Sequence, residues 1–277
     1  MERVSDLQFV LAESPRYLNG SVFFTDIDEK KFYCYSGSEV KMVWDKEQIT
    51  SFAFDVSGGM VFATMHGLYR MRQDGSYYAL AEGLKINDMG VDPKGRIIFG
   101  TNYHVSGRRF KFGSLYAYDA ETGLQELDYG YHLSNGVGFS PDGKTMYVSD
   151  SMAHMIYSYD YDPETLTCGR REVFVRFPLE DGLPDGMTID EEGNILTAQW
   201  GASCVIRTAP DGTEIERIPV PIKNVSAVEY TPSGLFITSA KGMNNGKEQY
   251  GGVFVTDTAF RGQPHKMANI PVNPNAK

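Results

Sequence analysis

The chain has few cysteines, and they are placed too far apart to build a framework. Cys34, Cys168 and Cys204 are an odd, scattered set, so they match neither a disulfide scaffold nor a thiolate metal site. We expect them to be buried or half-buried thiols. The opening residues MERVSDLQF contain no apolar stretch of the kind found in secretory signals. These absences together predict a cytoplasmic protein.

Basic charge is also scarce. The sequence has 26 Lys and Arg against 36 Asp and Glu, a net charge of −10. Binding to nucleic acid needs a clustered basic surface, and the basic tract at residues 108–111 is short enough to be a solvated loop. No run approaches ~18 apolar residues, the length that spans a bilayer. Neither nucleic acid nor a membrane is therefore expected as a partner, and the oligomeric state is left open.

The sequence shows no helical periodicity and no linker rich in Pro, Gly and Ser. Instead, one strand–turn–strand pattern recurs six times. Its turn glycines lie 39, 36, 48, 50 and 41 residues apart. A period of ~40–50 residues built of short strands is typical of a β-propeller. The copies read SPRYLNGSVFFTDI, FAFDVSGGMVFAT, MGVDPKGRIIFGT, VGFSPDGKTMYVSD, MTIDEEGNILTAQW and VEYTPSGLFITSA.

The sequence therefore predicts an all-β fold, a six-bladed β-propeller with four-stranded antiparallel blades around a central channel. Residues 1–277 would form a single domain, because no segment divides them. A propeller must close its ring or leave sheet edges exposed. We expect the N-terminal strand, at about residues 3–11, to pair with the last blade. The C-terminal stretch 265–277 could instead supply the outer edge.

Comparing the copies picks out one polar position at the start of each first strand. It lies eight residues before the turn glycine, or seven in the first copy. First strands line the channel of a propeller, so these side chains should face one axis. Two carboxylates and two amides there would suit a divalent cation. The residues are Glu13, Ser51, Asn87, Asn135, Asp185 and Ser226.

A structural role is the alternative for each of these positions, because polar residues at strand ends also cap blades or hold water. We favour that role for Ser51 and Ser226. Glu13 and Asp185 would repel one another unless a cation or a shared proton lies between them. A cation with Asn135 as third ligand resolves this conflict, and Asn87 could be a fourth ligand or a substrate contact.

Loops on the same face as the polar ring supply further candidates. Lys85 precedes the first strand of the third copy. Tyr103 and His104 follow its second strand and would be either pocket walls or surface loop. Asp88 is interpreted as a turn residue, and Asp150 as a residue that fixes a loop through backbone hydrogen bonds.

Four segments carry a family resemblance: AESPRY at 12–17, INDMGVDPKGR at 86–96, LSNGVGFSPDGKTMYVSDS at 133–151 and GLPDGMTIDEEGNILTAQWG at 182–201. In this order they resemble the gluconolactonase family, which includes regucalcin. The resemblance implies a six-bladed propeller with one divalent metal held by Glu13, Asn135 and Asp185, and with Asn87 contacting substrate. The chain departs from the family at Ala12 and Ser14, where glycines are usual. Its Lys85 stands where many sugar-lactone-cleaving members have Arg.

The leading functional hypothesis is metal-dependent hydrolysis of a sugar lactone, an aldonolactone opened to its aldonic acid. The metal would polarise the carbonyl while Asp185 orients or activates water. Lys85, Asn87, Tyr103 and His104 would grip the sugar. Calcium is the preferred cation for an all-oxygen site, with magnesium, manganese or zinc left open. The alternatives are an organophosphate or other ester hydrolase on the same site, and a non-enzymatic calcium-binding propeller.

Overall fold

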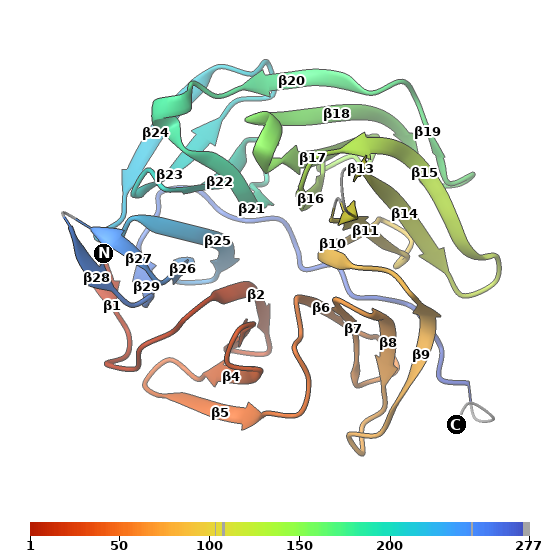
Figure 1. Cartoon of the computed structure of the whole chain (residues 1–277), viewed down its shortest axis with the longest axis horizontal. Helices are drawn as coiled ribbons and strands as arrows, with labels where there is room; N and C mark the ends of the chain where they lie inside the picture. Colours follow the sequence, from red (N-terminus) through yellow and green to blue (C-terminus); the bar gives the residue numbers. More distant parts are fainter. Residues whose placement is uncertain (103, 107–108, 245, 274–277) are drawn as a thin grey trace.

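The computed structural model describes residues 1–102, 104–106, 109–244 and 246–273. Within these residues the chain is built of antiparallel strands and two short 3₁₀ helices, η1 (Ser151–Ala153) and η2 (Leu179–Asp181). The sheets stand around a common central axis (Figure 1). No helix in the described ranges has the length and apolar character needed to cross a bilayer. The predicted all-β, propeller-like fold is confirmed.

The sheets follow one another along the chain, and three of them have the predicted four strands. These three comprise β2 (Ala12–Leu18), β3 (Ser21–Asp26), β4 (Lys31–Tyr35) and β5 (Val40–Trp44); β6 (Ser51–Phe54), β7 (Met60–Thr64), β8 (Gly67–Met71) and β9 (Tyr77–Glu82); and β10 (Ile86–Val91), β11 (Ile97–Thr101), β14 (Gly113–Asp119) and β15 (Gly123–Tyr131).

The other sheets are larger. A five-stranded sheet contains β16 (Ser134–Phe139), β17 (Thr145–Asp150), β18 (Met155–Asp162), β19 (Thr167–Cys168) and β20 (Glu172–Arg176). An eight-stranded sheet contains β1 (Glu2–Arg3), β21 (Leu183–Ile189), β22 (Ile195–Trp200), β23 (Cys204–Thr208), β24 (Glu214–Pro219), β25 (Asn224–Thr231), β26 (Gly234–Ala240) and β29 (Val253–Thr256). Two hairpins complete the fold: β12 (His104–Ser106) with β13 (Arg109–Lys111), and β27 (Gly242–Asn244) with β28 (Lys247–Gln249).

The start of the chain lies beside its last large strand. Strand β1 pairs antiparallel with β29, and Phe9 forms an isolated bridge with Gly251. Only Glu2 and Arg3 form a regular strand there. The first residues of the chain thus cover the edge that β29 would otherwise expose.

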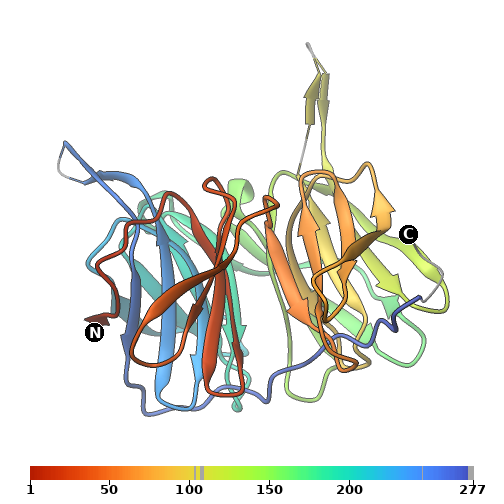
Figure 2. The ribbon, with the colours of Figure 1, turned by 90° about the horizontal axis from the view of Figure 1, so that it is seen from below.

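The C-terminal segment crosses the face that carries the turns between first and second strands (Figure 2). We call residues 259–273 the strap. Gln263 donates a side-chain hydrogen bond to the carbonyl of Phe139, Ala268 bridges Asp55, and the backbone N–H of Asn269 donates to the carbonyl of Gly95. The alternative expectation, that this stretch forms an outer edge strand, is wrong, because its backbone groups find partners in several sheets beneath the ring.

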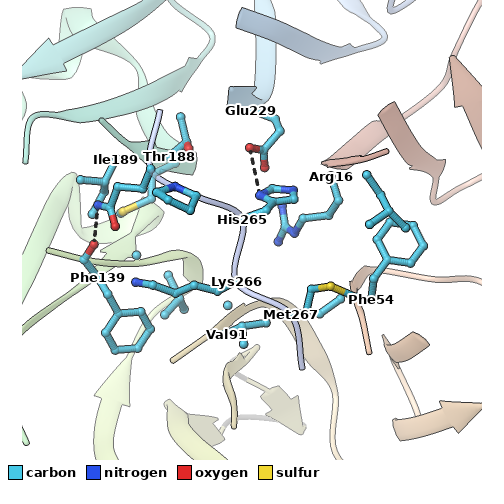
Figure 3. Close-up of a pocket in the computed structure, with 18 residues that line it drawn as sticks. Arg16, Phe54, Val91, Phe139, Thr188, Ile189, Glu229, His265, Lys266 and Met267 are labelled. Carbon is cyan, nitrogen blue, oxygen red and sulfur yellow. Dashed lines mark hydrogen bonds and ion pairs between the residues drawn. The ribbon is translucent and has the colours of Figure 1, made fainter. Parts of the chain in front are cut away.

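A small cavity lies between the strap and the ring (Figure 3), with a volume of about 120 Å³. Arg16, Glu229 and His265 line it, and the Nδ1 atom of His265 lies 3.7 Å from a carboxylate oxygen of Glu229. Burial raises the pKa of Glu229. This end of the channel is therefore closed by chain and by charged side chains.

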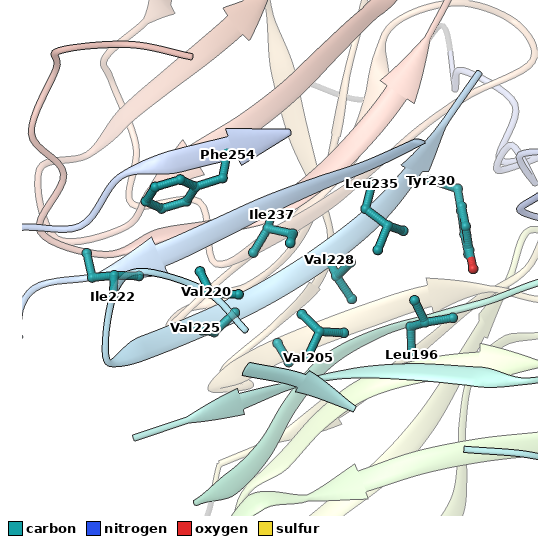
Figure 4. Close-up of a cluster of buried hydrophobic side chains, with 11 residues drawn as sticks. Leu196, Val205, Val220, Ile222, Val225, Val228, Tyr230, Leu235, Ile237 and Phe254 are labelled. Carbon is teal, nitrogen blue, oxygen red and sulfur yellow. The ribbon is translucent and has the colours of Figure 1, made fainter. Parts of the chain in front are cut away.

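Apolar side chains fill the spaces between neighbouring sheets. Successive residues of a strand point to opposite faces, so Ile195 belongs to one buried cluster, with Tyr147. Leu196 belongs to another, with Val228 and Leu235 (Figure 4). Each full burial of such a side chain contributes roughly 1.5–3 kcal/mol. This burial on both faces explains why the second strands read as nearly continuous apolar runs.

One buried arginine ties the strap to the second sheet. Arg70 on β8 is fully buried, and its guanidinium donates to the carboxylate of Asp55 at 2.9 Å and to the carbonyl of Ile270 at 2.9 Å. The other oxygen of Asp55 accepts the backbone N–H of Ile270 at 2.7 Å. The strap is thus held by charge-assisted hydrogen bonds that are shielded from water.

Replacing Arg70 with Met should lower the free energy of unfolding by about 3–5 kcal/mol, because Asp55 would remain buried without its partner. The measurement is chemical denaturation followed by intrinsic fluorescence. Arg217→Met is the matched control. Arg217 pairs with Asp181 at a partly exposed position, and such pairs contribute about 0–1 kcal/mol. Equal losses for the two variants would show that the strap is not anchored through Arg70.

Candidate functional site

A cavity of about 240 Å³ opens at the end of the channel opposite the strap. Four of the residues predicted from the repeats line it: Glu13, Asn87, Asn135 and Asp185. They come from β2, β10, β16 and β21. Residues that are distant in the sequence thus meet in one cavity, as the comparison of the copies predicts.

Three carboxylates converge in this cavity. Glu13, Asp88 and Asp185 are 9%, 8% and 6% exposed. Burial and the nearby charge of Asp88 raise the pKa of Glu13 to about 8. Burial, together with the charges of Glu13 and Asp88, raises the pKa of Asp185 well above its usual range. The site therefore brings three carboxyl groups together in a place largely shielded from water.

Asp88 is the site residue that sequence reasoning missed, since it was interpreted as a turn residue. The β10–β11 register shifts between Ile86 and Met89. Such an irregularity re-aims side chains, so both Asn87 and Asp88 reach the cavity. The equivalent position, one residue after the polar position of each copy, holds Ser14, Phe52, Gly136, Gly186 and Ala227 elsewhere. A comparison of this position across the copies would have revealed Asp88 as its only charged residue.

Hydrogen bonds to one oxygen fix the orientation of the Asp88 carboxylate. Its Oδ1 accepts hydrogen bonds from the Ser51 hydroxyl at 2.7 Å and from the Met89 backbone N–H at 2.8 Å. The Arg16 guanidinium lies 3.9 Å from the same oxygen, and its positive charge partly opposes the rise in the pKa of Glu13. Ser51 therefore orients a neighbouring carboxylate, a structural role of the kind predicted for it.

Asn135 and Asp185 are in direct contact. The Asn135 side-chain nitrogen donates to Asp185 Oδ1 and to the Ser151 hydroxyl, the latter at 3.2 Å. The Asn135 amide oxygen accepts the backbone N–H of Gly136 at 3.1 Å. The oxygen and nitrogen of an amide exchange places by a half-turn, so Asn135 can present an acceptor to the same space.

Glycines after two site residues allow the inner strands to approach closely. A Cβ atom on Gly136 would lie 2.7 Å from the backbone nitrogen of Met187, and one on Gly186 would lie 2.5 Å from the Cβ atom of Ala227. Any side chain at these positions would push neighbouring sheets apart. The close approach is what brings Asn135 and Asp185 together.

Carboxylates outside the cavity fix the loops that lead into it. Asp150 accepts the backbone N–H groups of His132 and Leu133, each at 3.0 Å. Asp26 accepts those of Val10 and Leu11 in the same way, each at 2.9 Å. The predicted loop-fixing role of Asp150 is confirmed.

The predicted substrate-binding residues do not all lie in the cavity. Asn87 lines the cavity, and its side-chain nitrogen donates to the carbonyl of Ser134 at 3.0 Å. Lys85 stands just before β10, where its carbonyl accepts the backbone N–H of Asn102 at 2.8 Å. His104 begins β12, in the hairpin that projects from the ring on the cavity side (Figure 2). Tyr103 lies outside the described residues.

The donor set fits a divalent cation. In the part of the chain that the structure describes, no group of three or more His, Cys, Asp and Glu is arranged to hold a metal by itself. An ion here would need the amide oxygen of Asn135 beside the carboxylates of Glu13 and Asp185. These are oxygen donors of the kind that hard cations prefer. Burial, followed by the charge of nearby carboxylates, raises the pKa of both acids, and a bound cation would favour their ionised forms instead.

Comparison with known proteins agrees with the motifs. Residues 11–241 match the model of the family described as SMP-30/Gluconolactonase/LRE-like region. The chain belongs to this family. It is 32% identical to a pentonolactonase of Haloferax volcanii over 67% of each chain, and 30% identical to regucalcin of Xenopus laevis over 95% of this chain and 98% of that one. A solved luciferin-regenerating enzyme superposes with a TM-score of 0.87 at 24% identity, over 97% of this chain and 98% of that one. The resemblance stated from the sequence is confirmed.

Without a cation, the protein should lose stability as pH rises from about 4.5 to about 8. The reason is that the pKa of Glu13 is about 8 in the folded state and 4.5 in the unfolded state. The folded state then binds more protons than the unfolded state across this window. Melting temperatures in EDTA across this range are the measurement, and an excess of Ca²⁺ should flatten the curve.

Asp185→Asn should also flatten it, because burial and the charges of Glu13 and Asp88 raise the pKa of Asp185 as well, and its own titration would no longer contribute to the slope. Asp181→Asn, at the surface pair with Arg217, is the control and should leave the slope unchanged. A melting temperature that does not vary with pH in EDTA would contradict the clustering of charge.

Proposed function

We propose that the protein is a metal-dependent lactonase that hydrolyses a sugar lactone to its aldonic acid. The observation that carries the proposal is that Glu13, Asn135 and Asp185 line one buried cavity in a member of the SMP-30/gluconolactonase/LRE-like family. The similarity to a pentonolactonase supports the substrate class.

Glu13, Asn135 and Asp185 would hold one divalent cation, and calcium suits their oxygen atoms best. When bound, the cation supplies Lewis-acid polarisation of a carbonyl oxygen, which is worth several kcal/mol in such reactions. Two carboxylates also match the double charge of the ion. A bound cation would offset the burial and the charge repulsion that raise their pKa values.

The chain's own residues position the reactants. Asp185 orients the attacking water through its carboxylate, whose Oδ1 also accepts the Asn135 side-chain N–H. Asn87 donates to a substrate hydroxyl with the N–H that is not bonded to Ser134. Lys85, just before β10, would contact the rest of the sugar. Contacts of Tyr103 and His104 with the sugar stay predictions from the sequence. Half-buried apolar side chains in the wall, such as Trp200, keep bulk water away.

The proposal includes the architecture. The eight-stranded sheet would count as two blades, β21 to β24 and β25–β26–β29–β1, since β22 and β25 join through a single residue pair, Trp200 with Asn224. With the remaining sheets this gives a six-bladed propeller formed by residues 1–277 as one domain. Each blade would then supply one first strand to the channel.

Asp185→Asn and Glu13→Gln should each lower kcat/KM by ~10²-fold or more, because each removes a charge that holds the cation. The measurement is a pH-indicator assay on five- and six-membered aldonolactones, with and without a chelator. Glu229→Gln is the matched control. Glu229 is also a buried carboxylate of a first strand, but it lines the cavity at the strap end, so activity should stay near that of the unaltered protein.

Other outcomes would replace the proposal. Full activity after thorough chelation would remove the metal from the reaction. Turnover of organophosphates or simple esters in place of lactones would favour the other hydrolase. Tight calcium binding in calorimetry, without turnover of any lactone or ester, would identify a calcium-binding propeller instead.

A further inference from the structure

Above the carboxylates, the cavity wall is apolar. Two residues before Glu13, Asn135 and Asp185 the chain has Leu11, Leu133 and Leu183. Side chains two apart along an extended strand share a face, so these leucines form a second level nearer the mouth. All three line the cavity and are half-buried.

Two further apolar residues complete this level from the ends of second strands. Ile27 follows β3, and its backbone N–H donates to the carbonyl of Leu11 at 2.9 Å. Trp200 ends β22 and pairs with Leu183. We call Leu11, Ile27, Leu133, Leu183 and Trp200 the apolar collar. Its members come from three sheet regions, so it borders a large part of the cavity.

Polar groups that remain available beside the collar are few among the described lining residues. The Thr50 hydroxyl donates to the carbonyl of Ile86 at 2.9 Å, and that of Ser151 donates to the carbonyl of Pro184 at 2.7 Å. Asn87 keeps its amide oxygen and one N–H for a ligand, because among the described residues its side chain bonds only to the carbonyl of Ser134. Polar recognition is therefore concentrated on the Asn87 side.

A polyhydroxylated lactone is poorly suited to this wall. A hydroxyl that leaves water and faces the collar finds no hydrogen-bond partner there, and that loss is unfavourable. A methyl or methylene at the same place gains from burial. Specificity of this kind is typically worth about 10–200-fold per group.

Resting on the proposed lactonase function, we propose that the substrate is a deoxysugar lactone. Its hydroxyl groups face Asn87, while an edge that carries hydrogen or methyl in place of a hydroxyl packs against the collar. The carbonyl end points down to the carboxylates. This narrows the substrate class from sugar lactones in general to those with one apolar edge.

Matched pairs of lactones that differ by one hydroxyl test the proposal. L-Rhamnono-1,4-lactone and L-mannono-1,4-lactone differ only at C6, and 2-deoxy-D-ribono-1,4-lactone and D-ribono-1,4-lactone differ only at C2. For at least one pair, kcat/KM should be about tenfold higher for the deoxy member, a difference of about 1.4 kcal/mol. Equal or faster hydrolysis of the hydroxylated member in both pairs would overturn the deoxysugar assignment and leave the lactonase function standing.

Substitution within the collar gives the second arm. Leu133→Asn and Leu183→Asn should each reduce the preference for the deoxy member by about fivefold or more, because the amide offers a partner to the extra hydroxyl. Leu18→Asn is the matched control. Leu18 is another half-buried leucine at the strap end of the channel, and its substitution should leave the ratio unchanged. A ratio measured within one preparation does not depend on the fraction that is folded.

The two proposals fail in different ways. If no lactone is hydrolysed with any divalent cation, the lactonase function is wrong. The collar is then tested by calorimetry with the open acids, L-rhamnonate against L-mannonate and 2-deoxy-D-ribonate against D-ribonate. Tighter binding of a deoxy acid, weakened by Leu183→Asn, would support the apolar collar. Equal binding in both pairs would overturn it.

Discussion

The repulsion between buried carboxylates at the centre of the ring is the constraint on which the site depends. Glu13, Asp88 and Asp185 come from different sheets, and their shared burial raises the pKa values of Glu13 and Asp185. Carboxylates placed in this way repel one another when they are ionised. They are held by inner strands that pack closely at Gly136 and Gly186. The fold thus imposes a charged geometry that a divalent cation would relieve.

The two ends of the channel differ in structure: the strap closes one end, and the candidate site opens at the other. At the strap end, chain crosses beneath the ring and is fixed by buried groups such as Arg70. At the other end, the cavity has a floor of acids and an apolar collar. The first strands begin at the cavity and end at turns that the strap contacts through Phe139, Asp55 and Gly95. The same strands therefore carry the site residues at one end and the partners of the strap at the other.

Much of this arrangement could be predicted from the residues. The repeat predicted an all-β propeller-like fold, and the six turn glycines do have positive φ, between 71° and 120°. The same comparison brought Glu13, Asn87, Asn135 and Asp185 into one cavity. Asp88 was missed because strict alternation turns it away from Asn87, whereas the register shift in β10 brings both inward. The strap was missed because its backbone partners, such as Asp55 and Gly95, are distant in the sequence.

The sequence by itself determined the repeat, and with it the strands, the turns and the position that lines the cavity in four of the copies. It could do so because alternation and turn chemistry are local properties of the chain. Only the tertiary structure decided how near the acids lie, that Asp88 joins them, that leucines form a collar above them, and where the C-terminal segment runs. Those features depend on distances between sheets and on bulges, which arise from packing among residues far apart in the chain.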